Sequence, residues 1–332
     1  MSITKRHIAL LIGLVLLLPV IMYLHLISGQ INVSISDYFN AFFSPEEGNT
    51  LQLIAREIRV PRMAMAIVAG AALSVAGLLM QTLFNNPLAG PFVLGINSGA
   101  SLFVAFSFMT GVPLLASNLG VVTSALIGAF VFGLIIMAFS FVVRSHISLL
   151  LIGLMLGSFT GALVYVLQSL SASEELKAFA MWSMGSLQHA DLHQLLFIFI
   201  FFVVGVIGAL LMVKPLNAMV LGEQDATLLG VNLKYVRLLV ILITALLTGL
   251  ITAYCGPIAF VGLAIPNLVR IIFKTQNHFV LVIASCLIGG FFLLSCDALI
   301  QLAEAKIHIP INALTSLIGA PFVVFIVLKR LA

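Results

Sequence analysis

Ten stretches of apolar residues, most of them long enough to cross a bilayer as a helix, constrain this chain more than any other feature. A transmembrane helix needs about 20 predominantly apolar residues. Only 8% of the residues are charged, whereas soluble domains contain about 25%. We therefore predict an all-α integral membrane protein that forms one transmembrane domain over residues 1–332. The ten predicted spans are residues 8–28, 60–82, 92–109, 115–142, 147–170, 193–213, 235–254, 258–273, 279–300 and 311–330.

The basic residues predict an orientation for these spans. Ten spans place both termini on one side. If that side is cytoplasmic, the inner loops and ends hold ten of the fifteen Lys and Arg residues. Cytoplasmic loops of membrane proteins carry such an excess. We therefore expect both termini in the cytoplasm. The basic residues form no run longer than a pair, so the net charge of +4 does not indicate binding to nucleic acid.

The sequence contains no energy source for transport. Asp297 and Arg270 are the ionisable residues nearest to mid-membrane, and both lie close to span ends. Proton- and sodium-coupled carriers usually place ionisable groups in the middle of the membrane, so a secondary transporter is disfavoured. No G-x-x-x-x-G-K-[ST] phosphate-binding loop occurs in the chain. No catalytic Ser/His/Asp set is clustered either, which disfavours an integral-membrane enzyme.

Three arginines precede the second span at three-residue spacing. Arg56, Arg59 and Arg62 would lie near one face if this segment is helical. One interpretation is that they reach lipid phosphates at the membrane interface. The other is that they dock an acidic protein outside the membrane.

Small residues and turn residues shape the second span and its exit. Ala66, Gly70 and Ser74 recur every four residues, which lets another helix approach closely. Asn86-Pro87 then predicts a cytoplasmic turn, because Pro stops a helix. A Gly-Pro pair follows this turn, and a second one stands at Gly256-Pro257 outside the membrane. This echo either reflects an inverted repeat of spans 2–5 and 7–10 or arises by chance.

The fifth span carries Gly153, Gly157 and Gly161 at four-residue spacing. Such a stripe most often packs against a neighbouring helix of the same chain. The functional alternative is a seam between two subunits or a smooth pathway wall.

The segment of about residues 216–233 contains both inner-face acids. Glu223, Ala226, Leu229 and Gly230 predict a short surface helix with Ala and Leu on one side and Gly230 as its stop. It is either an ordinary amphipathic loop or a coupling helix that seats in a cytoplasmic motor.

We expect no metal site in the chain. His189 and His193 lie four residues apart in an outer loop, but no third ligand is near in sequence. The three cysteines form no C-x-x-C pair and are interpreted as packing residues.

Taken in order along nearly the whole chain, these motifs resemble the FecCD family of permeases, which includes vitamin B12, ferric siderophore and haem permeases. The matching motifs are Arg59-x-x-Arg62, Gln81 to Ala89, Leu94-Gly95, Ser98-Gly99-Ala100, Trp182 to Ser186, Leu221-Gly222, Leu229-Gly230, Gly256-Pro257 to Pro266, Pro310 and Gly319-Ala320-Pro321.

The resemblance implies the fold of type II ABC importer permeases and a set of partners. A second permease, identical or homologous, would form a pathway with this chain in the bacterial inner membrane. Two ATPase subunits would bind ATP and Mg and dock at the segment of Leu221, Gly222, Glu223, Ala226, Leu229 and Gly230. A substrate-binding protein would dock outside.

The resemblance also implies roles for individual residues. Arg59 and Arg62 would form salt bridges with the binding protein, with Arg56 and Lys306 as added candidates. The cytoplasmic gate would lie at Asn86, Leu88, His146 and Ile147, and Gly153, Gly157 and Gly161 would be near the pathway.

Two positions depart from the family pattern. Gln301 stands where many relatives have a further outer Arg, and Asn267 follows Pro266 where His is common. The sequence does not identify the cargo: we expect a ferric siderophore, with haem or a corrinoid as the alternative.

Overall fold

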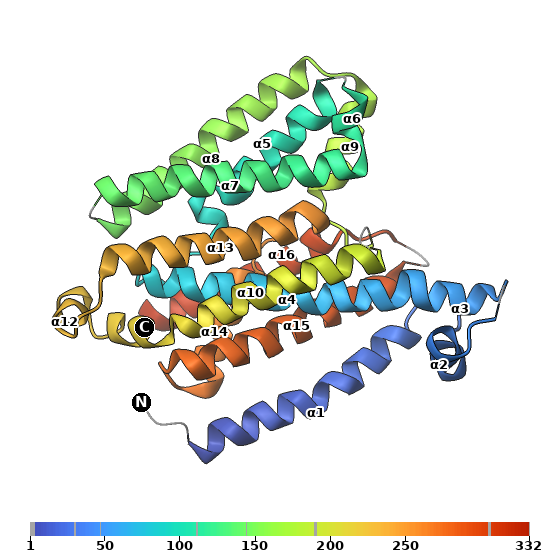
Figure 1. The fold of residues 1–332 in the computed structure, drawn as a ribbon, viewed down its shortest axis with the longest axis horizontal. Coiled ribbons are helices and arrows are strands. Elements are labelled where there is room, and N and C mark those ends of the chain that lie inside the picture. The colour runs from blue at the N-terminus through green and yellow to red at the C-terminus, as the bar shows by residue number, and fades with distance from the viewer. Residues whose placement is uncertain are drawn as a thin grey trace.

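The computed structural model describes residues 4–29, 31–46, 48–110, 112–143, 145–188, 191–304 and 307–331, and every regular element in them is helical (Figure 1). Ten apolar helices coincide with the ten predicted segments. Their bounds are α1 Lys5–Ile27, α4 Val60–Leu83, α5 Ile96–Met109, α7 Asn118–Val142, α8 His146–Ser169, α10 Leu192–Leu211, α13 Leu233–Cys255, α14 Val261–Phe273, α15 His278–Ala303 and α16 Ile311–Leu331.

Seven of these segments are long and apolar enough to span a membrane. α5, α14 and the described part of α16 are shorter apolar helices. In α5 and α14 the missing length is irregular backbone. Residues 91–94 form a short 3-10 turn that Gly95 (φ 73°) separates from α5. Residues 256–260 have no regular structure, and α14 begins only at Val261. The span predicted to start at residue 258 therefore begins later as a helix.

Helix α4 forms the centre of the bundle, and nearly all of its side chains are buried. Its small residues explain this position, since α15 approaches so closely that a Cβ on Gly70 would lie 2.1 Å from the carbonyl oxygen of Gly289. The predicted close helix contact at Gly70 and Ser74 is therefore confirmed. In Figure 1, α5, α7 and α8 form one layer above this centre, and α1 lies along the opposite side next to α15.

The segments that connect the long helices lie at two opposite ends of the molecule (Figure 1). One end holds both chain termini together with two short helices, α11 Val213–Met219 and α12 Glu223–Leu228. The other end holds four short helices: α2 Ile35–Phe43, α3 Thr50–Ile54, α6 Pro113–Ala116 and α9 Ser173–Ser183. We call these the α12 end and the α9 end.

Candidate translocation and docking surfaces

The three spaced arginines do not share one face. They lie at the α9 end, where a π-helical turn (Ala55–Arg59) joins α3 to α4. A π-turn is wider than an α-turn, so residues three apart point in more divergent directions than α-helical spacing predicts. The Arg56 side chain is 49% exposed and lies 3.4 Å from Glu57, whereas Arg59 and Arg62 are buried. The predicted clustering is therefore wrong for Arg56, whereas Arg59 and Arg62 both lie beside the C-terminal ends of α1 and α15.

Arg62 forms a buried ion pair with Asp297 of α15. Its Nε and Nη2 donate to the two carboxylate oxygens at 2.8 to 3.1 Å. His25 of α1 contacts the same carboxylate at 2.7 Å, and the Gln301 amide donates to it at 3.1 Å. Arg62 Nη1 also lies 3.6 Å from Glu304, which is the partly exposed end of this group. We call His25, Arg62, Asp297 and Gln301 the α9-end polar cluster.

Arg59 is held by the chain segment that follows α1. Its guanidinium donates to the carbonyl oxygens of Leu26 and Ile31 and to the Tyr38 hydroxyl. The Tyr38 hydroxyl in turn donates to Leu26 O at 2.8 Å. Burial raises the pKa of Tyr38, and this outweighs the opposing effect of Arg59, so the phenol keeps the proton that it donates. Both motif arginines therefore have their partners inside this chain.

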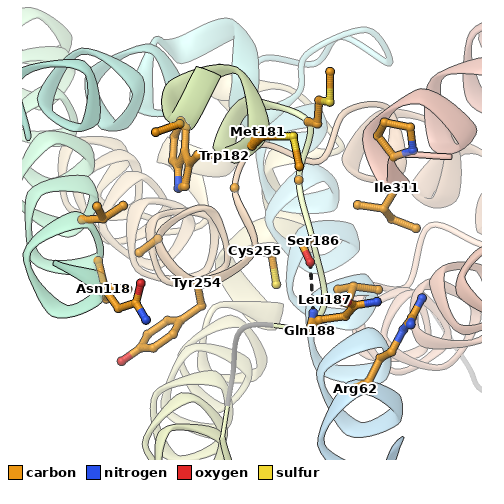
Figure 2. A pocket seen from close by; sticks show the side chains of 18 of the residues that line it. Arg62, Asn118, Met181, Trp182, Ser186, Leu187, Gln188, Tyr254, Cys255 and Ile311 are labelled. Atoms are coloured by element: carbon orange, nitrogen blue, oxygen red, sulfur yellow. Dashed lines mark hydrogen bonds between the residues drawn. The ribbon is translucent and has the colours of Figure 1, made fainter. Parts of the chain in front are cut away.

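A cavity of about 380 Å³ lies at the α9 end, within the range of small-molecule sites. Figure 2 shows Trp182, Tyr254 and Asn118 on one side of it and Ser186, Leu187 and Gln188 on the other. The lining is mixed: aromatic faces alternate with amide and hydroxyl groups. The buried indole N–H of Trp182 has no hydrogen-bond partner among the described residues.

The predicted surface helix exists as α12 at the α12 end. Gly222 (φ 117°) and Gly230 (φ 83°) flank it in backbone conformations that favour glycine. Ala226 is fully buried, but Leu229 is 65% exposed, so the expected shared Ala and Leu face is wrong. Glu223 is tied to Arg237 of α13 at 2.7 Å. Exposed leucines at the two ends of an anchored helix can fill an apolar groove on another protein. These leucines are Leu221, Leu228 and Leu229.

The predicted gate residues occupy two connections between helices. In the α4–α5 turn, the Asn86 side chain accepts from the backbone N–H of Leu88 at 2.9 Å, which fixes the turn, and Leu88 is 42% exposed. At the start of α8, Ile147 is 72% exposed. The backbone of His146 begins α8, but its side chain lies outside the described residues.

The first two of the three α8 glycines, Gly153 and Gly157, face α5. A Cβ on Gly95, just before α5, would lie 3.4 Å from Gly153 O, and one on Gly157 would lie 3.3 Å from Ser98 Oγ. Gly161 has open space around it. Large apolar side chains cover the rest of α8 and are exposed, among them Met155, Phe159 and Tyr165. Plain packing thus accounts for the first two glycines, and an apolar face is left for lipid or a second subunit.

Some predicted residues cannot be placed. Lys306 and His189 lie outside the described residues, as does the side chain of His193. Among the described residues, no group of three His, Cys, Asp or Glu side chains could hold a metal ion.

Sequence reasoning missed His25, Tyr38 and the pairing of Arg62 with Asp297. One signal was present in the sequence: His25 is a polar residue near the C-terminal end of the first predicted span, as Asp297 is near the C-terminal end of the ninth. Buried ionisable groups in membranes pair with one another, and the two could have been matched on that basis.

Comparison with known proteins decides which family has this architecture. The model of the FecCD transport family matches residues 16–329. The chain belongs to the FecCD transport family. Its relatives are permease subunits of ABC transporters, and like them it is a multi-pass membrane permease and not an enzyme.

The FecCD relatives differ in the cargo that their names state. The hemin transport permease HmuU of Yersinia pestis is 35% identical, with 97% of this chain and 96% of the relative covered. The vitamin B12 import permease BtuC of Salmonella paratyphi A is 33% identical, with 98% and 96% covered. A probable iron chelatin permease of Helicobacter pylori is 33% identical, with 87% of each chain covered.

Solved structures agree with the fold. An inward-facing ABC transporter described as of metal-chelate type is 32% identical, with a TM-score of 0.85 and 97% of this chain and 99% of that chain covered. PsaBC from Streptococcus pneumoniae, at 16% identity and a TM-score of 0.56, covers 88% of this chain and 95% of its own and supports the fold alone.

Proposed function

We propose that this permease imports a ferric siderophore or a similar iron chelate across the bacterial inner membrane. That it is the membrane subunit of an ABC importer of the iron chelate, haem or vitamin B12 type follows from the family and the matched structure. Similarity to the iron chelatin permease over 87% of the chain supports the proposed cargo. Haem is the second candidate, because HmuU matches over 97% of the chain. A corrinoid is the third, because BtuC matches over 98%.

The assembly that we propose contains two permeases, two ATPases and one substrate-binding protein. The ATPases bind ATP and Mg and seat on α12, where Leu228 and the flanking Leu221 and Leu229 are exposed. Glu223 and Ala226 hold α12 to the bundle. The exposed side of α8 is suited to pairing with the second permease. Both termini and α12 share one end of the molecule, which we assign to the cytoplasm. Orientation, stoichiometry and the absence of a cofactor bound by this chain are all part of the proposal.

The binding protein docks at the α9 end in this proposal, and its acidic groups meet Arg56 first. Arg59 and Arg62 are buried and paired within the chain, so they contact a binding protein only after exchanging those partners. Gate movement at Leu88 and Ile147 then admits cargo to the cytoplasm.

Uptake in proteoliposomes tests the cargo. The complex with its ATPase and binding protein is supplied with ATP and one of three probes: a 55Fe-labelled ferric siderophore, haemin or 57Co-cyanocobalamin. ATP-dependent accumulation of the ferric siderophore alone supports the proposal. Accumulation of haemin or cyanocobalamin in its place supports the corresponding alternative. Flux through the permease without the ATPase contradicts an ATP-driven importer.

A further inference from the structure

A path of hydrogen-bonded polar side chains crosses the bundle at the α12 end, where the surroundings are otherwise apolar. It begins at Asn217 in α11, whose side-chain oxygen accepts from both the backbone N–H and Nδ1 of His278, each at 2.9 Å. His278 Nε2 lies 2.8 Å from the Thr82 hydroxyl of α4. Arg270 of α14 donates to the same hydroxyl at 3.2 Å.

The hydrogen-bonded path continues from Arg270 to the α4–α5 turn. Arg270 also donates to the side-chain oxygen of Gln81. Gln81 Nε2 donates to Leu263 O at 3.1 Å. Asn267 Nδ2 donates to this same carbonyl at 2.9 Å and to Pro87 O at 2.9 Å. The path thus connects α11, the ends of α15 and α4, and α14 with the turn that carries Leu88.

The hydrogen bonds between Arg270 and Asn217 can all point in one direction. The Thr82 hydroxyl can donate either to Leu78 O at 3.0 Å or to His278 Nε2. When it donates to Nε2 and accepts from Arg270, a neutral His278 donates from Nδ1 to Asn217. Hydrogen bonds aligned in this way polarise one another and act as a unit in a medium of low dielectric constant. His278, Gln81 and Asn267 are buried, with 0%, 3% and 2% of their surface exposed, whereas Asn217 and Arg270 are partly exposed. Water therefore has little access to the three buried members of the path.

One atom is left without a partner at the turn. Asn267 Oδ1 is buried and has no hydrogen-bond partner among the described residues. A buried acceptor without a donor raises the free energy of the arrangement that contains it. A rearranged turn that supplies a donor would therefore be favoured at this point. This is the property that a two-state element needs.

We propose that this path transmits movement of α11 and α12 to the α4–α5 turn, with Thr82, His278, Asn217 and Asn267 as positioning residues for gate movement. The inference rests on the proposed docking of an ATPase at α12. It assigns a role to Asn267, which the sequence left without one. A force on α11 displaces Asn217 and His278, and the buried bonds carry this displacement to Pro87 because breaking them would leave polar groups unpaired.

Labelling of residue 88 tests the proposal without knowledge of the cargo. Leu88→Cys is introduced where Cys255, Cys286 and Cys296 are replaced by alanine, and the complex with its ATPase is treated with a membrane-impermeant maleimide, with and without a non-hydrolysable ATP analogue. We expect nucleotide to change the labelling rate of L88C. Thr82→Val or Asn217→Ala should each reduce this nucleotide effect by about fivefold, the factor for one net hydrogen bond.

The matched control is Thr248→Val in α13, which removes a buried hydroxyl that has no partner among the described residues. It should respond like the parent. The double variant T82V/N217A should lose no more than the worse single variant, because both act on one path. Additive losses, or a full response in T82V and N217A, would overturn the linkage. Failure of the parent complex to carry out ATP-driven uptake would instead defeat the proposed function.

Discussion

The α9-end polar cluster shows how individual charges are kept in an apolar bundle. Arg62 and Asp297 satisfy each other with three donor contacts, and His25 and Gln301 fill the remaining positions on the carboxylate. A buried pair of this kind contributes little net stability, but the loss of one partner is costly because the other charge stays buried. The family-typical arginine at position 301 would add a second cation here, whereas the neutral Gln301 is accommodated.

Replacing Asp297 by Asn tests this balance. The variant leaves the Arg62 guanidinium buried without its counter-ion, and we expect destabilisation of about 3–5 kcal/mol. The measurement is thermal unfolding of the purified permease in detergent. Glu57→Gln is the control, since it breaks the exposed pair with Arg56, and exposed pairs contribute about 0–1 kcal/mol. Equal melting of D297N and the parent would show that the cluster is not structural.

At the scale of elements, glycines decide how closely helices approach and how short helices end. Gly70 allows α4 and α15 to touch backbone to backbone. Gly222 and Gly230 have open space around them, so their role is purely conformational.

Gly70→Ala should disrupt the central helix pair. The added Cβ would lie 2.1 Å from Gly289 O, a backbone atom that can move only if the helices separate. Overpacking of this kind costs about 1–3 kcal/mol or more. Thermal unfolding of the purified permease measures the effect. Gly13→Ala in α1 is the control, because it has no neighbour within 4 Å and removes a flexible residue from a helix. A melting temperature for G70A at or above that of G13A would contradict the close approach.

Gly230→Val should weaken attachment of the ATPase. A β-branched residue rarely adopts positive φ, and the left-handed conformation costs about 1–2 kcal/mol. We therefore expect α12 to shift and less ATPase to co-purify with the permease. Gly230→Asn provides the comparison, since Asn tolerates this conformation and should retain most of the ATPase. If G230V and G230N retain equal amounts of ATPase, the backbone conformation at position 230 is not what holds α12 in place.

At the scale of the whole molecule, the two ends have different chemistry. The α12 end presents exposed leucines beside an anchored helix, and the α9 end presents charged residues and a cavity of mixed lining. A central bundle with very close helix contacts connects the ends. This arrangement suits a permease that other proteins drive and load.

Arg56→Glu should slow docking of the binding protein at the α9 end. Exposed charges act mainly on association rates, so the association rate should fall several-fold at low salt and approach that of the parent at high salt. Surface plasmon resonance with the immobilised permease measures both rates. Lys234→Glu, a charge reversal at the other end of the molecule, should have no effect. Salt-independent loss of binding in R56E would indicate misfolding rather than lost steering.

The sequence could predict much of this architecture, because the length and polarity of a membrane helix are local properties. All ten apolar segments were located, and so were the turn at Asn86 and the glycine that ends α12. Local patterns failed where helical spacing was assumed across the π-turn at Ala55–Arg59. They also failed where Leu229 was expected to share a buried face with Ala226.

The sequence alone determined that this chain lies in a membrane and forms helices, since the length and polarity of an apolar segment need no knowledge of contacts. Only the tertiary structure decided which polar groups meet. His25, Arg62 and Asp297 are separated by up to 272 residues in the sequence. Asn217 and Thr82 are also distant in sequence, and His278 contacts both of them. Partners so distant in sequence are chosen by helix packing, which fixes the geometry that a buried hydrogen bond requires.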